Sequence, residues 1–353
     1  MYQISNLPEL IALLPADRRA RFERIFHVDT VAGRCVIPDT MRAWTEDHFG
    51  SVAEVETQTV VRVTNLVTWD GALFNPLRNR RPVLSRQSSA DSQQSPEDVF
   101  ADPLRTTAAD TFGRARGEHC VTASNVARWD GQCGVLIFDD PDPMAFTRDH
   151  IRDYFRASLA WACRAHDADP GARYFVWMWN GGAAGGASVM HAHAQLGLGR
   201  RRHYARVEGL RRAALDYRER HAADYFADLL AAHADVGLAF QTCGLDGFVY
   251  LAPIKNKETW VFGHAFDDKF ADAFHDTLRA LVDRAGVRAF DAAILMPPLF
   301  GPLDEDWSRF PVIARIIDRG RPEAVSSDFG ALDVFAHSVI THDPFAVRAA
   351  LAL

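Results

Sequence analysis

The segment from Asn180 to Gln195 combines residue types that suit phosphate chemistry. It reads NGGAAGGASVMHAHAQ, so a glycine- and alanine-rich turn leads directly into two histidines and a glutamine at alternate positions. If the last residues form a strand, His191, His193 and Gln195 share one face, because side chains alternate along a strand. The turn has little side-chain bulk, so its backbone N–H groups could approach an anion closely. The segment therefore predicts a phosphoryl-transfer site.

Regular elements that could position this segment lie on its N-terminal side. A short apolar run at 134–138 indicates a strand, and an acidic loop follows it. Apolar residues then recur at helical spacing over 147–166, with Thr147 as a suitable N-cap. The aromatic run 174–179 indicates a second strand, which ends at the turn.

The same order of elements recurs in a weaker form later in the chain. A strand is predicted at 259–262, an acidic pair at 267–268, a helix at 269–284 and a strand at 290–296. The copy then ends in PPLFG and contains no histidines. We infer an internal duplication with one active and one degenerate half. One long charged helix at about 204–233 is expected to link the halves, and a hairpin with Asp70-Gly71 as its turn is expected at 59–74.

Composition restricts the class of protein. The chain has 353 residues, 48% of them hydrophobic, and a net charge of -7, which disfavours a general nucleic-acid surface but allows a local basic pocket. No apolar run is long enough to span a bilayer and no signal-peptide pattern begins the chain, so we expect a cytoplasmic protein. Five scattered cysteines without a C-x-x-C are expected to be reduced and mostly buried. The polar segment 85–96 is expected to be a mobile loop.

The motif resembles the histidine-triad (HIT) superfamily, in the branch that contains galactose-1-phosphate uridylyltransferases and the dinucleotide and ADP-sugar phosphorylases. The hallmark of that branch is an Asn, a Gly/Ala turn, a Ser and then H-x-H-x-Q. The positions that match in type and spacing are Asn180, Gly186, Ser188, His191, His193 and Gln195. A second, P-x-R-x-x-R-P-like match at 74–82 contains Arg78 and Arg81. The resemblance implies an α+β fold of two HIT-like (GalT-like) units, with antiparallel sheets flanked by helices. The expected units are a catalytic half at 1–203 and a degenerate half at 204–353.

The resemblance also implies a reaction. His193 would attack the α-phosphorus of a nucleoside diphosphate sugar or dinucleotide, and a phosphate or sugar phosphate would then accept the nucleotidyl group. His191 and Gln195 would assist, and Gln195 distinguishes transferases of the superfamily from hydrolases, which have a third histidine there. The expected phosphate-binding residues are Asn180, Gly185, Gly186, Ser188, Arg78 and Arg81. For the two arginines, a solvated surface pair is an equally weighted alternative. A homodimer is compatible with the resemblance.

The departures from the family pattern concern metal and substrate. The family's zinc uses a C-x-x-C, a histidine after the acidic loop and the first histidine of H-x-H, whereas this chain lacks the C-x-x-C and has Asp142 at the second place. Only His191 remains, so neither zinc nor another cofactor is expected. A set of Cys120, Cys133 and His191 is the alternative metal site. The second half also lacks the family's late H-x-H, which leaves open a degenerate protein that binds nucleotides or sugar phosphates without turnover.

A vaguer match lies in the second half. Lys257-Glu258-Thr259 is similar to the family's F-E-T, so Lys257 and Glu258 are candidates for lining an acceptor pocket. The alternative for these two residues is a solvated charged turn.

Overall fold

The computed structural model describes residues 2–80, 98–301, 304–322 and 329–353, and these ranges adopt an α+β fold. Among the described residues, nine strands form one antiparallel sheet in the order β4-β5-β7-β6-β11-β12-β10-β9-β8. The strands are β4 (Cys120–Ser124), β5 (Cys133–Phe138), β6 (Ala172–Gly181), β7 (His193–Arg200), β8 (Ala239–Thr242), β9 (Leu245–Val249), β10 (Thr259–Gly263), β11 (Phe290–Leu295) and β12 (Val312–Asp318).

The strand order repeats within this sheet. The chain leaves β5 through helix α6 (Arg148–Ala168), forms β6, and returns as β7 between β5 and β6. It later leaves β10 through helix α9 (Asp268–Asp283), forms β11, and returns as β12 between β10 and β11. The two runs meet where β6 pairs with β11. The predicted repeat of strand, acidic loop, helix and strand therefore has a counterpart in the topology, and β12 takes the place that β7 has in the first run.

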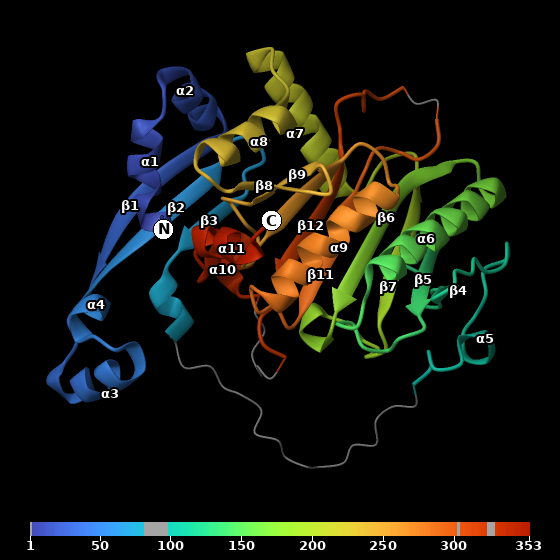
Figure 1. Cartoon of the computed structure of the whole chain (residues 1–353), viewed down its shortest axis with the longest axis horizontal. Helices are drawn as coiled ribbons and strands as arrows, with labels where there is room; N and C mark the ends of the chain where they lie inside the picture. The colour runs from blue at the N-terminus through green and yellow to red at the C-terminus, as the bar shows by residue number, and fades with distance from the viewer. Residues whose placement is uncertain (1, 81–97, 302–303, 323–328) are drawn as a thin grey trace.

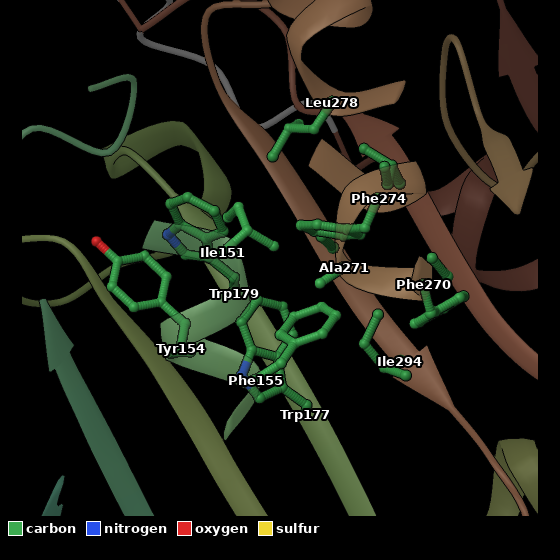
Figure 2. Close-up of a cluster of buried hydrophobic side chains, with 14 of the residues drawn as sticks. Ile151, Tyr154, Phe155, Trp177, Trp179, Phe270, Ala271, Phe274, Leu278 and Ile294 are labelled. Carbon is green, nitrogen blue, oxygen red and sulfur yellow. The ribbon is translucent and has the colours of Figure 1, made fainter. Parts of the chain in front are cut away.

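Helices α6 and α9 lie side by side on one face of the sheet (Figure 1). The side chain of Thr147 caps α6 by accepting from the backbone N–H of His150 (3.2 Å), as the sequence predicts. Large aromatic side chains of both helices and of β6 fill the space beneath them (Figure 2). The rings of Phe155 and Trp177 lie 5.3 Å apart, and those of Trp177 and Phe274 lie 5.8 Å apart. This core fixes the helices against the strand that leads to the turn.

Ion pairs join the two helices along their contact. Arg152 donates from Nε and Nη2 to the two carboxylate oxygens of Asp272 at 2.7 and 2.8 Å. Arg156 pairs with Asp268 in the same way, one turn along. Such bidentate pairs fix orientation as well as contact.

A second sheet stands beside the first (Figure 1). Its order is β1-β2-β3-β13, with β1 (Phe26–Arg34), β2 (Thr57–Asn65), β3 (Gly71–Phe74) and β13 (Ser338–Ile340). The remaining helices are η1 (Ile4–Asn6), α1 (Leu7–Leu13), α2 (Ala16–Ile25), α3 (Asp39–Phe49), α4 (Val52–Glu56), η2 (Pro76–Arg80), α5 (Pro103–Thr106), η3 (Ala183–Gly185), α7 (Ala205–His221), α8 (Tyr225–Asp235), α10 (Ala331–Phe335) and α11 (Pro344–Leu351). Strand β13 comes from the end of the chain and pairs with β3, so segments on both sides of the predicted boundary at 203 share this sheet. The division at that boundary stays a prediction.

Three expectations about local structure need correction. The long helix at 204–233 is two helices, because Ala222 takes the left-handed conformation (φ 51°) and ends α7. The hairpin turn spans 66–70, since Gly71 already pairs with Thr64. Of the five cysteines, two are buried and two exposed, and all five are free. The segment 85–96, expected to be mobile, lies outside the described residues.

Candidate functional site

The side chains of β7 alternate between the hydrophobic core on one face of the sheet and the candidate site on the other. Ala194, Leu196 and Leu198 are buried in the core cluster that includes α6 and α9. His193 and Gln195 therefore face the opposite side of the sheet, since neighbouring residues of a strand point to opposite faces. His191 lies before the strand, which begins at His193. The predicted strand therefore does not extend to His191, although the ring of Phe100 contacts the rings of both histidines.

The ring of His193 has one nitrogen engaged by the backbone. Its Nδ1 lies 2.8 Å from the carbonyl oxygen of His191. A carbonyl oxygen only accepts, so Nδ1 is the protonated nitrogen and Nε2 of the neutral ring keeps its lone pair. Burial lowers the pKa of His193 below its ordinary value of 6.5, which favours the neutral ring near pH 7. The ring of Phe100 packs edge-on against it at 5.1 Å.

The ring of His191 is held at both nitrogens. Nδ1 lies 2.8 Å from Oδ2 of Asp98, and Nε2 lies 2.7 Å from the carbonyl oxygen of Phe138. Burial raises the pKa of Asp98, but the hydrogen bond from His191 and those from the backbone outweigh it, so the pKa lies below its usual range. Asp98 is therefore ionised near neutral pH and accepts from His191. The sequence analysis missed Asp98, because nothing in the local sequence connects it with a residue 93 positions away.

Gln195 has a polar partner from a neighbouring segment. Asn125, which follows β4, donates its side-chain N–H to Oε1 of Gln195 (3.1 Å). With its oxygen engaged, the carboxamide N–H₂ of Gln195 is the end left to donate to a ligand on this face.

The turn between β6 and β7 depends on its glycines. Gly182 (φ 86°) and Gly186 (φ 87°) take backbone conformations that favour glycine. Gly185 is constrained by space, since a Cβ there would lie 2.7 Å from the carbonyl oxygen of Phe290. The side-chain nitrogen of Asn180 lies near Gly186, 4.0 Å from where a Cβ would be, and Ser188 is exposed.

Two amides of the turn already have partners. Gly185 N–H donates to the carbonyl oxygen of Gly182, and Gly186 N–H donates to that of Ala183, each at 3.0 Å. These contacts assign Gly185 and Gly186 to the shape of the turn. Direct contact of Asn180, the two glycines or Ser188 with a phosphate stays a prediction.

The second half of the chain contacts the turn through a residue that the sequence analysis missed. Arg319 follows β12 and forms an ion pair with Asp291, which pairs across the sheet with Asn180. Nη1 of Arg319 also lies 3.5 Å from the carbonyl oxygen of Gly185. The end of β12 therefore supports the turn from the side away from β7. No local pattern marks Arg319, because its role depends on the order of the strands.

Lys257 and Glu258 are buried, so the alternative of a solvated charged turn is wrong. Nζ of Lys257 lies 2.7 Å from Asp318, and Glu258 accepts from Arg315 Nε (2.8 Å) and from Trp260 Nε1 (2.6 Å). The next residue, Thr259, is in register across the sheet with Ala194 of β7, four strands away. At about 4.8 Å per strand, this separation is about 19 Å. Within one chain, these contacts give both side chains a role in the fold, and their part in an acceptor pocket stays a prediction.

Arg78 is not brought to His193 by any contact in the described part of the chain. Arg78 is exposed on η2, which lies beneath β3 and is separated from β7 in the view of Figure 1 by β11 and β12. Arg81 lies outside the described residues. Phosphate binding by either arginine stays a prediction.

The residues around His191 do not fit a zinc ion. A histidine ligand must turn a ring nitrogen toward the metal, but Nε2 of His191 faces the carbonyl oxygen of Phe138 at 2.7 Å and Nδ1 faces Oδ2 of Asp98 at 2.8 Å. At the acidic loop, Asp142 instead accepts from the backbone N–H of Met144 (2.8 Å). Throughout residues 2–80, 98–301, 304–322 and 329–353, no three His, Cys, Asp or Glu side chains gather into a set that could hold a metal. The alternative set of Cys120, Cys133 and His191 is therefore not brought together as a metal site.

Comparisons with known proteins identify the fold. The sequence matches no family model and no curated protein. The structure is similar to that of a uridylyltransferase, with a TM-score of 0.57 and 16% identity over 83% of this chain and 98% of that one. It is also similar to an ADP-glucose phosphorylase from Arabidopsis thaliana with bound ADP-glucose (TM-score 0.62, 15% identity, 83% and 98% coverage). A GalT-like protein from the same organism gives a TM-score of 0.59 at 15% identity, covering 82% of this chain and 97% of that one.

These matches assign the fold of the chain to the type found in uridylyltransferases and sugar-nucleotide phosphorylases, the branch that the motif resembles. They do so over more than four-fifths of the chain. At 15–16% identity they show a shared fold, and activity has to be argued from the site. None of the described helices is long and apolar enough to cross a membrane.

Proposed function

We propose that this protein is a nucleotidyltransferase, or a nucleotide-sugar or dinucleotide phosphorylase, that acts through a covalent nucleotidyl-histidine intermediate on His193. The observation that carries the proposal is the hydrogen bond from His193 Nδ1 to the carbonyl oxygen of His191. It fixes the tautomer in which Nε2 has a lone pair, beside a turn without bulky side chains.

The reaction has two displacements. The lone pair of His193 Nε2 attacks the α-phosphorus of the donor, a P–N bond forms, and the P–O bond to the leaving phosphate breaks with its electron pair. A phosphate oxygen of the acceptor then attacks the same phosphorus, and the P–N bond breaks and returns the lone pair to Nε2. Splitting one difficult displacement into two is the advantage of a covalent intermediate, and ping-pong kinetics follow from it.

Neighbouring groups would stabilise the charge that develops on the non-bridging oxygens. The carboxamide N–H₂ of Gln195 and the hydroxyl of Ser188 are candidates, as are the turn amides that follow Gly186. One well-placed donor of this kind contributes about 3–4 kcal/mol to transition-state stabilisation.

The donor class follows from the fold and the motif together. A shared fold with a uridylyltransferase and with an ADP-glucose phosphorylase supports nucleoside diphosphate sugars as first candidates, with dinucleotides next. Phosphate or a sugar phosphate would be the acceptor.

The test is the intact mass of the protein after incubation with nucleoside diphosphate sugars and dinucleotides, one at a time. A gain equal to one nucleotidyl group, which is a nucleoside monophosphate less one water, supports the covalent intermediate and identifies the base. His193→Ala should abolish the gain while the fold is retained. If the alanine variant is labelled at the wild-type rate, the assignment of the nucleophile is wrong. Binding of a donor with no gain by the wild-type protein would instead support a nucleotide-binding protein without turnover.

A further inference from the structure

The segment 98–101 contacts both histidines of the motif. The carboxylate of Asp98 accepts from the ring of His191 at 2.8 Å, and the ring of Phe100 lies 5.1 Å from that of His193 and 6.1 Å from that of His191. Asp98 also orders its own segment, because Oδ1 accepts from the backbone N–H of Phe100 (3.0 Å). One short segment thus supplies both a polar and an aromatic contact to the site.

A chain of hydrogen bonds leads from Asp98 to the nucleophile. Asp98 and the carbonyl oxygen of Phe138 hold the ring of His191 from its two nitrogens. The carbonyl oxygen of His191 in turn accepts from Nδ1 of His193. Because the ring and the carbonyl belong to one residue, fixing the ring restricts the direction of the carbonyl. The orientation of His193 Nε2 therefore depends on Asp98 through His191.

We propose that Asp98 positions the nucleophile through His191, and that this carboxylate–imidazole hydrogen bond takes the place of a metal ion in holding the first histidine of the motif. The inference rests on the proposed function, in that it assigns the nucleophile to His193. It assigns to Asp98 no contact with the substrate and no step in the chemistry. Asp98 is a positioning residue in this scheme.

The first experiment compares variants in single-turnover nucleotidylation with the donor that labels the wild-type protein. Asp98→Ala should lower the rate constant about 10–100-fold, which is the effect typical of removing a residue that orients a functional side chain by a hydrogen bond. The donor concentration at half-maximal rate should stay within about twofold, because no donor contact is lost. Asp98→Asn should restore most of the rate, since its side-chain oxygen can still accept from His191 Nδ1.

The matched control is Asp102→Ala. Asp102 lies in the same part of the chain and is similarly exposed, and the one contact of its side chain with the described residues is an exposed ion pair with Arg105 (3.3 Å). Its side chain does not cap α5. The rate constant of this variant should equal that of the wild-type protein.

The second experiment needs no substrate. In ¹⁵N-histidine-labelled protein, the two-bond ¹H–¹⁵N spectrum distinguishes protonated from unprotonated ring nitrogens, and His193→Ala identifies the signals of His193. The wild-type protein, Asp98→Asn and Asp102→Ala should show the Nδ1–H form of His193 alone. Asp98→Ala should show a mixture of the two tautomers.

The two experiments separate the inference from the proposed function. If no donor labels the wild-type protein, the proposed function is wrong, and the ring spectra still decide whether Asp98 fixes His193. Unchanged His193 signals in Asp98→Ala overturn the inference, whatever the labelling shows. Equal loss of rate in Asp98→Ala, Asp98→Asn and Asp102→Ala also overturns it. The rate would then depend on the conformation of the segment and not on the hydrogen bond between Asp98 and His191.

Discussion

A methyl group at Gly185 tests whether the shape of the turn controls the chemistry. Gly185 packs against β11, where a Cβ would lie 2.7 Å from the carbonyl oxygen of Phe290 and 3.0 Å from Oδ1 of Asp291. The backbone of β11 is fixed on both sides, by β6 and by β12. In Gly185→Ala the turn must therefore move, because the strand cannot.

The size of the displacement follows from the contact. Ordinary van der Waals contact begins at 3.4 Å, so the turn has to move by the difference from 2.7 Å, which is 0.7 Å. Overpacking of this kind costs about 1–3 kcal/mol of folding free energy. With an unfolding entropy of about 2.1 cal/mol/K per residue over 353 residues, each kcal/mol lowers Tm by about 1.3 °C. The stability loss is thus a few degrees, whereas misplacing catalytic groups by about 1 Å can cost about 100-fold in rate.

The assay measures single-turnover nucleotidylation beside thermal unfolding. Gly185→Ala should lower the rate constant about 10–100-fold and Tm by about 1–4 °C. Gly209→Ala is the matched control, because Gly209 lies inside α7 and a Cβ there meets nothing within 4 Å. That variant should gain about 1 kcal/mol of stability and keep its rate. Gly185→Ala with wild-type rate and wild-type Tm would refute the argument.

Three further predictions concern the pH dependence of the reaction, the metal content of the protein and the two arginines of the sequence motif. Burial lowers the pKa of His193 below 6.5, so the reactive neutral ring persists in mildly acidic solution. The single-turnover rate should therefore stay level from about pH 8 to below pH 6.5 and fall only at still lower pH. An inflection above pH 6.5 would contradict this. Metal analysis of the purified protein should find far less than one zinc per chain, since both ring nitrogens of His191 face oxygen atoms of the protein, those of Asp98 and Phe138. About one zinc per chain would contradict this. Arg78→Lys and Arg81→Lys keep the positive charge but lose the guanidinium fork that suits phosphate, so the affinity for the donor should fall while Tm stays constant. A large fall in Tm at unchanged donor affinity would instead assign both arginines to the fold.

The sequence determined the local elements of the first run. Thr147 and the apolar spacing after it predict helix α6, and the aromatic run predicts β6, because caps and periodicity depend on neighbours within a few residues. The glycines of the turn are informative in the same way, since Gly182 and Gly186 do take conformations that favour glycine. The repeat of strand, acidic loop, helix and strand also has a counterpart in the structure, with α9 in the place of α6, whereas the position of β12 between β10 and β11 was not predicted.

Some local patterns were misleading. The charged segment at 204–233 has continuous helical character, but the helix ends at Ala222, and no glycine or proline, the usual marks of such a break, stands at that point. Lys257 and Glu258 have the composition of a solvated turn, yet both are buried because Asp318 and Arg315 come from β12 to pair with them. A buried charge is stable only with its partner, and the partner is not visible in the local sequence.

The tertiary structure alone decided which distant residues complete the candidate site. Asp98 meets His191 across 93 positions, and Arg319 meets the Gly185 turn across 134. Neither residue stands in a periodic pattern. Their contacts follow from the strand order that places β7 between β5 and β6, and the end of β12 near the turn that follows β6. The motif thus fixed which residues could react, while the packing of distant segments decided what holds them in place.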